Sequence, residues 1–461
     1  MPASHTATHP SETIRSESVA LLKLGGPLIL TSLVNMGMSI TDVIMIGWLD
    51  PVSLAAGAAA SDFYSLVFYP CAGVIAALAV QIAQARGRNY HHAIAPNTHS
   101  ALLIALLMAL PGMALIFFSP LLLGLIRVAN DVVTTSAPYA RWMSATFFTM
   151  LLVIICNQFL SSHGLTRIIF RSTLFILPFN AAMNYLLMFG KGPFPAMNLA
   201  GAGLSSWLSS LLLLTILLQQ IYRRDEFKDY ALFKKFSPNH QDCRELLHVG
   251  IPIGLSNLGE MGVFMASTLL MGTVGALPLA AHAIAMRSGG VCYAFPAGLG
   301  HACMIRVGLA AGRGDNNAIY LSQHSGMIIG TLCGLLLAGL LWWQHTAIID
   351  LFLGNSTGNT YGETAQHDTA FILIMAFMMP LDAIFITCSG ALRGLKDTRI
   401  PMLITLFGYW LIGGGGSLIG LYWLNLGGLG VWISLAIAQL FVAAGLWWRW
   451  QVVRKTLGKQ T

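Results

Sequence analysis

Twelve apolar runs, each long enough to cross a lipid bilayer as a helix, follow one another along the chain with short polar segments between them. A spanning helix takes about 20 apolar residues. The hydrocarbon core of a bilayer offers backbone N–H and C=O groups no hydrogen-bond partner, so a spanning segment must be a helix or a strand of a closed barrel. Barrel strands would be shorter and would alternate apolar and polar residues. The sequence therefore predicts an all-α polytopic membrane protein. Its predicted spans are 20–48, 54–84, 98–126, 137–160, 168–190, 199–221, 246–273, 278–309, 321–346, 367–390, 399–423 and 428–449.

The charge content excludes a soluble protein. Only 9% of the 461 residues are Asp, Glu, Lys or Arg, whereas soluble domains carry about 25%. The surface of this chain must therefore face a lipid bilayer. The net charge of +7 does not indicate a nucleic-acid partner, because the basic residues lie in short clusters between apolar runs and form no long stripe.

The basic residues predict the orientation of the spans. An even number of spans puts both termini on one side, and most of the 25 Lys and Arg residues then fall in loops and tails of that side. Positive residues stay preferentially in the cytoplasm. We expect a multi-pass protein of a bacterial inner membrane with both termini cytoplasmic.

The two halves of the chain repeat at a distance of 225 positions. Matched pairs include Pro27 and Pro252, Gly47 and Gly272, Ala72-Gly73 and Ala297-Gly298, and Gly87-Arg88 and Gly312-Arg313. Six spans per copy give both copies the same orientation, related by an axis along the membrane normal. Two pseudo-symmetric six-helix bundles with a central cleft follow from this repeat.

The polar segments set the expected boundaries of these bundles. The longest polar stretch carries Arg223, Arg224, Lys228, Lys234, Lys235 and Arg244. We expect a mobile cytoplasmic tail (1–19), an N-terminal bundle (20–221), a cytoplasmic linker (222–245), a C-terminal bundle (246–450) and a second cytoplasmic tail (451–461).

Four of the 18 acidic residues lie well inside predicted spans: Asp42, Asp62, Glu260 and Asp382. An acid at mid-helix costs about 2.5–3.5 kcal/mol on insertion scales, so such residues usually face a cavity and function there. The alternative is a buried, hydrogen-bonded carboxyl that only holds helices together. A purely structural scaffold would not be expected to keep four of them.

We expect polar side chains from two other spans to lie close to Asp42. Asn180 and Asn184 share one helix face, and Ser206 follows on the next span. Carboxylate, amide and hydroxyl oxygens suit Na⁺, and the same groups can hydrogen-bond a protonated carboxyl. Asn and Ser also join membrane helices without any ligand. The residue types leave both interpretations open.

Asp62 and Arg287 occupy equivalent positions in the repeat, since 62 and 287 differ by 225. Equivalent residues of two bundles related by a twofold axis can face each other across a cleft. We predict a gate pair that forms when the outer mouth closes. The alternative is that each residue has partners within its own bundle.

No enzyme site is apparent in the sequence. There is no nucleophile with a base, no metal-binding cluster and no phosphate-binding loop of the Gly-x-x-x-x-Gly-Lys-Ser/Thr type. We therefore expect no enzyme activity, no cofactor and no use of ATP.

The chain resembles the multidrug and toxic compound extrusion (MATE) family, in particular its NorM-like branch, over all twelve spans. The motifs that carry the resemblance are Thr41-Asp42, Asn180-x-x-x-Asn184, Gly201-Ala202-Gly203-Leu204-Ser205-Ser206, Gly250-Ile251-Pro252 with Glu260, Ile305-Arg306-Val307-Gly308, and Asp382 with Ser389-Gly390-Ala391-Leu392-Arg393-Gly394-Leu395-Lys396-Asp397-Thr398. The resemblance implies an antiporter that exports amphipathic, often cationic small-molecule drugs in exchange for H⁺ or Na⁺. We also expect the protein to be a monomer.

The resemblance also implies two cation sites. Asp42, Asn180, Asn184 and Ser206 would form the N-lobe site, and Glu260 with Asp382 would form the C-lobe site. Na⁺ is a candidate ligand at Asp42, Asn180 and Asn184 or at Glu260 and Asp382. The family often has Thr at the Ser206 position. It commonly has Tyr four residues before the second acid, where this chain has Met378. That change removes an oxygen that Na⁺ could use.

A second transport function stays open at this point. A lipid-linked saccharide flippase of the same superfamily would need a large cationic cleft. The spans of this chain offer Arg287 but mainly carboxylates.

Overall fold

The computed structural model describes the backbone of residues 13–125, 128–353 and 359–457. Side chains are described for the same residues except 348–368. All regular structure in these ranges is helical, and twelve helical segments are long and apolar enough to cross a membrane. The predicted fold class, an all-α protein with twelve spans in two bundles, is confirmed.

The N-terminal half supplies six of the spans and forms the N lobe. Its helices are α1 (Ile14–Gly47), α2 (Pro51–Gly87), the short 3-10 turn η1 (His91–Ala93), α3 (Ile94–Phe117), α4 (Ser119–Leu125), α5 (Asn130–Ser162), α6 (Thr166–Phe189) and α7 (Leu199–Tyr222).

The C-terminal half supplies the other six spans and forms the C lobe. A short 3-10 segment, η2 (Asp225–Tyr230), lies between the lobes in sequence. The C-lobe helices are α8 (His240–Val274), α9 (Ala276–Arg313), α10 (Asn316–Leu353), α11 (Asn359–Gly394), α12 (Arg399–Leu406), the π-helix η3 (Phe407–Gly415), α13 (Gly416–Tyr422) and α14 (Gly427–Leu457). The segments α12, η3 and α13 together make one span.

Local sequence explains where the helices begin. Asp50 caps α2 by accepting a hydrogen bond from the backbone N–H of Ser53 at 2.8 Å, and Pro51 occupies the first turn, where its missing N–H is not needed. The hydroxyl and the N–H of Ser53 both stabilise the carboxylate and lower the pKa of Asp50 below its usual value.

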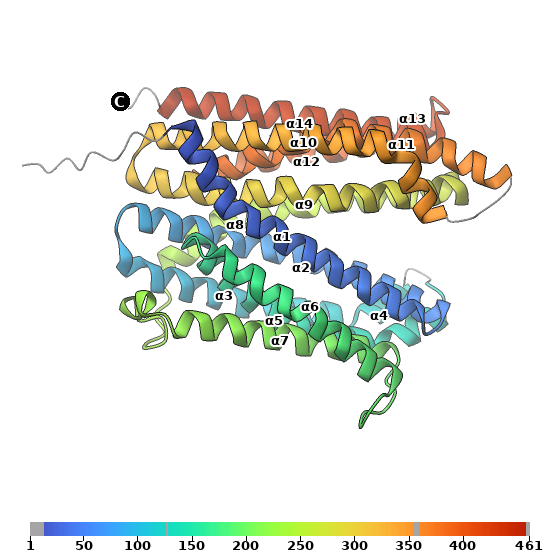
Figure 1. Ribbon diagram of the computed structural model, residues 1–461, viewed down its shortest axis with the longest axis horizontal. Coiled ribbons are helices and arrows are strands. Elements are labelled where there is room, and N and C mark those ends of the chain that lie inside the picture. The colour runs from blue at the N-terminus through green and yellow to red at the C-terminus, as the bar shows by residue number, and fades with distance from the viewer. Residues whose placement is uncertain (1–12, 126–127, 354–358, 458–461) are drawn as a thin grey trace, which may run out of the picture.

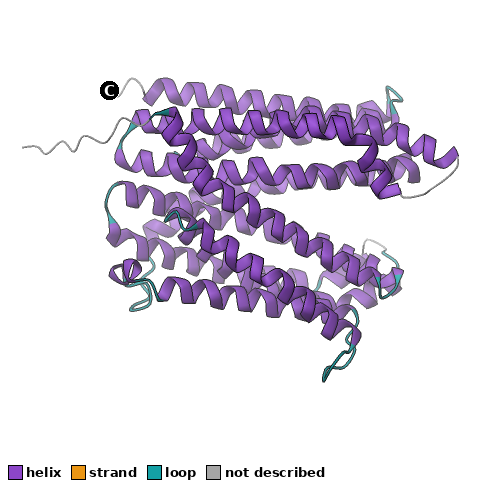
Figure 2. Cartoon of the chain, in the orientation of Figure 1, coloured by secondary structure: helices purple, strands orange, loops and turns teal. Residues whose placement is uncertain are grey.

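The two lobes meet near one face of the molecule, where α1 begins and α14 ends; we call this the terminal face. From there the lobes diverge towards the opposite face, as Figures 1 and 2 show. Helix α1 runs diagonally between the lobes and packs against α6 of the N lobe as well as α9 and α10 of the C lobe.

Small residues allow the backbones of the two lobes to touch, and the contacts repeat with the register of the sequence. A Cβ atom on Gly73 of α2 would lie 2.8 Å from the Cα atom of Gly254 on α8. The equivalent Gly298 on α9 meets Ile29 on α1, whose backbone nitrogen would lie 2.9 Å away. Since 73 and 298, and likewise 29 and 254, differ by 225, the lobe contacts obey a pseudo-twofold axis.

The helices extend beyond the predicted spans. Helix α1 begins at Ile14, so residues 14–19, expected in the mobile tail, are helical; residues 1–12 of that tail lie outside the described part. Helix α14 ends at Leu457, so most of the expected C-terminal tail is also helical, and residues 458–461 lie outside the described part. The apolar runs mark only the lipid-facing middle of each helix, because the ends carry polar side chains.

Candidate binding sites

A cavity of about 710 Å³ lies between the lobes. Helices α8, α9 and α11 of the C lobe form most of its wall, and α2 of the N lobe contributes the rest. Three acids line it, namely Asp62, Glu260 and Asp382. The remaining lining residues are Ser65, Leu66, Tyr69, Asn257, Met261, Phe264, Met265, Thr268, Leu269, Met286, Gly289, Gly290, Tyr293, Met375, Met378 and Met379.

The two predicted C-lobe acids share this cavity. The Tyr293 hydroxyl on α9 donates a hydrogen bond to the Glu260 carboxylate on α8 at 3.0 Å. Asp382 on α11 is only 8% exposed, and its carboxylate makes no hydrogen bond with the side chains that the structure describes. The structure therefore brings Glu260 and Asp382 to one cavity from two helices.

Tyr293 is a residue that the sequence analysis missed. The sequence places Met378 where the family commonly has a phenol, and the structure supplies a phenol from another helix instead. Met378 lines the same cavity. No spacing rule indicates Tyr293, because it lies on a different span from both acids and only packing brings it to Glu260.

The predicted N-lobe residues also meet, on α1 and α6. The side-chain nitrogen of Asn184 donates to Asp42 at 2.5 Å and lies 3.4 Å from the side-chain oxygen of Asn180. The side-chain oxygen of Asn184 is buried and has no hydrogen-bond partner among the described residues. This oxygen can accept from a proton donor or coordinate a cation.

Ser206 does not join this group. Its hydroxyl donates to the carbonyl oxygen of Ala202 on its own helix at 3.0 Å. Ser205 and Ser209 take its place: the side-chain nitrogen of Asn180 lies 3.5 Å and 3.4 Å from their hydroxyl oxygens. Residues four apart share a helix face, whereas the next residue points about 100° away. The sequence thus predicted the correct turn of α7, but the residue that meets Asn180 is Ser205 and not Ser206.

Asp62 and Arg287 form no ion pair in the described structure. Asp62 lines the cavity, whereas Arg287 is not among its lining residues. The predicted gate pair is thus separated while the lobes diverge at the opposite face.

Buried polar contacts join the lobes near the terminal face. Glu17 on α1 is 1% exposed. It accepts hydrogen bonds from Arg306 on α9 and, at 2.6 Å, from Ser322 on α10. Ser161 on α5 lies 3.3 Å from the Nε2 atom of His301 on α9. Glu17 could not be predicted as a buried residue from the sequence, because it precedes the first apolar run.

The geometry provides two separate carboxylate sites on different lobes and one large mixed cavity. The N-lobe site has amide oxygens around one acid, and the C-lobe site has two acids and a phenol. Each can bind a small cation or a proton. The cavity wall, with six methionines, can adapt to ligands of different shape.

Comparison with known proteins agrees with the internal repeat. The MatE family model matches the chain twice, over residues 27–186 and 252–415. A probable multidrug resistance protein NorM from Rhizobium meliloti is 30% identical over 441 residues, 93% of this chain and 92% of that protein. A protein of the same name from Pseudomonas aeruginosa is 31% identical over 432 residues, 93% of this chain and 88% of that protein.

Solved structures share the fold. A eukaryotic MATE transporter superposes with a TM-score of 0.87 at 19% identity, covering 97% of this chain and 99% of that one. An outward-facing multidrug resistance MATE family transporter of the MOP superfamily gives a TM-score of 0.87 at 18% identity, covering 96% and 97%. With both halves matched by the family model and nearly the whole length shared with these relatives, the chain belongs to the multidrug and toxic compound extrusion family.

Proposed function

We propose that this protein is a secondary active exporter of amphipathic, often cationic drugs, driven by exchange for H⁺ or Na⁺. We place it in a bacterial inner membrane with the terminal face towards the cytoplasm, as the basic loops favour. Relatives that carry the name multidrug resistance protein NorM support this proposal.

The observation that carries the proposal is the wall of the cavity between the lobes. Three carboxylates line it together with methionines and aromatic rings, and none of the described lining residues is Lys or Arg. A negative, apolar cavity attracts an organic cation and repels a polyanion. The wall therefore disfavours a lipid-linked saccharide, which carries phosphate groups, as cargo.

The coupling cation would act through the same carboxylates. Glu260 and Asp382 place two acids at one low-dielectric cavity, where their repulsion favours uptake of a proton or Na⁺. Once neutralised, they attract an organic cation less strongly. Binding of the small cation and of the drug are then in competition, which is what antiport requires.

The N-lobe site would add a second point of coupling. The orphan oxygen of Asn184 beside Asp42 is satisfied if Asp42 is protonated or if a cation lies between them. Either event removes the charge of Asp42. We propose this as the reason for the pairing of two asparagines with one acid.

The membrane potential and ion gradient suffice as the energy source. One unit charge that crosses 100 mV releases about 2.3 kcal/mol, which corresponds to roughly a fifty-fold concentration ratio. No nucleotide needs to bind. The lobes would alternate between the arrangement seen here, joined at the terminal face, and one joined at the opposite face.

Dye efflux from proteoliposomes tests the proposal. A pH gradient and a Na⁺ gradient are applied in turn to wild type, Asp42→Asn, Glu260→Gln and Asp382→Asn. Asp131→Asn is the matched control, because Asp131 is exposed at the start of α5. We expect efflux under at least one gradient, its loss in the three site variants and its retention in the control. Efflux at the wild-type rate with all three acids replaced would contradict the proposal.

A further inference from the structure

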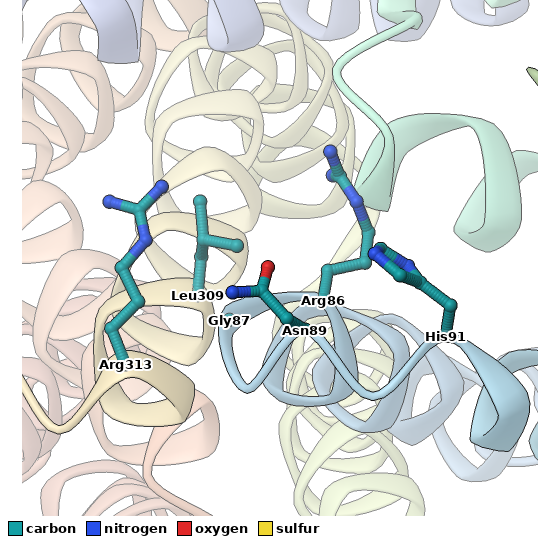
Figure 3. Close-up of a pocket in the computed structure, with 6 residues that line it drawn as sticks. All are labelled: Arg86, Gly87, Asn89, His91, Leu309 and Arg313. Atoms are coloured by element: carbon teal, nitrogen blue, oxygen red, sulfur yellow. The ribbon is translucent and has the colours of Figure 1, made fainter. Parts of the chain in front are cut away.

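A second pocket, of about 300 Å³, lies at the seam between the lobes near the terminal face. Its walls are Arg86, Gly87, Asn89, His91, Leu309 and Arg313. The first four lie on or just after α2, and the last two lie at the end of α9. Figure 3 shows the side chains of both lobes arranged around this one hollow. The pocket is therefore complete only when the lobes are together.

The pocket is strongly positive. It brings together two guanidinium groups, Arg86 and Arg313, and the ring of His91, with no acid among its described lining residues. In Figure 3 both guanidinium groups extend to the same side, with the amide of Asn89 between them. The nearby Glu226 forms an ion pair with Arg224 at 2.8 Å. Guanidinium groups are preferred donors to the oxygens of an anion, so this lining favours an anionic ligand.

The groups are held in place by the backbone around them. Arg86 donates through Nη1 to the carbonyl oxygen of Ser162, which fixes its side chain and leaves other N–H groups for a ligand. Asn89 adopts a left-handed conformation with φ 55°, which Asn tolerates better than most residues. The tight turn at Asn89 places its amide beside the basic groups.

Neutralisation of helix dipoles does not account for this arrangement. Both α2 and α9 end here, and a basic residue at a helix C-terminus offsets its free carbonyl groups. To neutralise its helix dipole, each helix needs only one basic side chain near its own C-terminal carbonyl groups. Dipole neutralisation explains neither the shared hollow nor His91, which precedes α3.

We propose that this pocket binds a phosphate group and that the bound phosphate holds the two lobes together at the terminal face. Arg pairs bind phosphate oxygens through several parallel N–H donors, and the Asn89 amide adds another. The phosphate is supplied by a soluble cytoplasmic anion or by the headgroup of an anionic lipid; this placement rests on the orientation in the proposed function. A ligand that needs both lobes binds only this conformation and stabilises it. It would therefore slow the return of the transporter to the inward-open state.

Binding is tested on the full chain in detergent by its melting temperature. Inorganic phosphate and pyrophosphate are titrated against chloride at equal ionic strength. We expect both phosphates to raise the melting temperature of wild type and of Arg88→Gln. Arg88 is exposed, loses the same charge and does not line the pocket. Arg313→Gln should need roughly tenfold more phosphate for the same shift, because it loses hydrogen bonds to a charged group.

Equal phosphate responses in Arg313→Gln and Arg88→Gln would overturn the proposal, since general charge would then explain the effect. Arg313 is exposed, so its replacement should not impair folding. Arg86→Gln and Arg313→Lys complete the series: the first should weaken phosphate binding, and the second should retain more of it than Arg313→Gln. The detergent assay needs no transport, so the phosphate site can hold even if the proposed export function fails.

Proteoliposomes distinguish the two sources of phosphate. Efflux is compared in phosphatidylcholine vesicles with pyrophosphate on the terminal face, and in vesicles that contain phosphatidylglycerol without soluble phosphate. Slower efflux with pyrophosphate identifies a soluble anion, and slower efflux only with phosphatidylglycerol identifies a lipid headgroup. In either case Arg313→Gln should relieve the slowing and Arg88→Gln should not. If neither condition slows efflux by wild type, the proposal that bound phosphate holds the lobes together is wrong.

Discussion

The backbones of Gly87 and Gly312 are in direct contact where α2 and α9 meet. The two glycines occupy equivalent positions in the two halves of the chain. A Cβ atom on either glycine would lie 2.9 Å from the Cα atom of the other. Each would also collide with a carbonyl oxygen, that of Leu309 for Gly87 and that of Gln84 for Gly312. The axis that relates the lobes therefore passes close to this pair.

Gly312→Leu should force the lobes apart at the terminal face. Overpacking of a well-packed site costs about 1–3 kcal/mol, so the melting temperature in detergent should fall by several degrees. Gly339→Leu on α10 is the matched control, because nothing lies within 4 Å of a Cβ atom there. Similar melting temperatures for the two variants would contradict the tight seam.

Tyr293→Phe should impair ion-driven dye efflux several-fold, because the Glu260 carboxylate loses its hydrogen-bond donor. Hydrogen bonds to charged groups contribute about 1.5–3 kcal/mol. Tyr409→Phe is the control, since the buried Tyr409 hydroxyl donates to Gln439 at 2.6 Å and not to Glu260. Both variants should lose some stability, and only Tyr293→Phe should lose efflux. Equal efflux in the two would exclude a coupling role for Tyr293.

Asp62→Arg and Arg287→Asp should each reduce efflux, because each places two like charges at equivalent positions across the cleft. The double exchange should restore much of the lost rate if the two residues pair in the state closed at the opposite face. Dye efflux of the four proteins completes the cycle. An exchanged protein no better than the worse single variant would rule out the gate pair.

Glu17→Ala should destabilise the protein strongly, because it removes the buried carboxylate that accepts hydrogen bonds from Arg306 and Ser322. Breaking a buried pair in this way costs about 3–5 kcal/mol. Glu226→Ala removes an exposed pair with Arg224 and should change the melting temperature very little. If the two variants melt alike, Glu17 does not hold α1 to the C lobe.

His163 should make stability fall in mild acid. This residue lies between α5 and α6, where burial, assisted by the charges of Arg86 and His91, lowers its pKa to about 4. The unfolded chain has a His pKa of about 6.5 and therefore binds a proton that the folded protein does not accept. Stability should decline as pH falls from about 6.5 to about 4, by up to ~3 kcal/mol.

The measurement is the melting temperature of wild type and His163→Phe at pH 7.5 and pH 5. Phenylalanine keeps the packing of the ring against Phe159 and Phe227 but cannot titrate. The variant should lose less stability on acidification than wild type. His240→Gln, at an exposed position at the start of α8, should behave as wild type. An unchanged pH response in His163→Phe would show that other groups control it.

The twelve spans and the repeat could be predicted from sequence because lipid imposes long apolar runs and because the shift of 225 needs no gap. Asn180 and Asn184 could be placed together for a similar reason, since one helix face is a local property. Contacts between side chains on different helices could not be predicted in the same way. Ser205 rather than Ser206 meets Asn180, because the rotation of α7 depends on packing that no single span reveals.

The contacts of residues outside the apolar runs, or on different spans, could not be predicted from the sequence. Glu17 is buried because α1 extends past its apolar part and reaches α9 and α10. Tyr293 contacts Glu260 only because α8 and α9 meet at the cavity. The proposed phosphate pocket likewise depends on the ends of α2 and α9, which are far apart in sequence. Each of these features arises from tertiary packing, which hydropathy does not encode.

The seam of glycines is shared by the two halves, but their acids are not. Asp42 lies in one lobe and Glu260 and Asp382 in the other, so duplication preserved the joint while the chemistry diverged. The methionines of the cavity wall lie on α8, α9 and α11 and are not among the nearest neighbours of Gly87 and Gly312. Evolution can therefore alter which compounds are accepted by changing that wall alone, without rebuilding the machinery that moves.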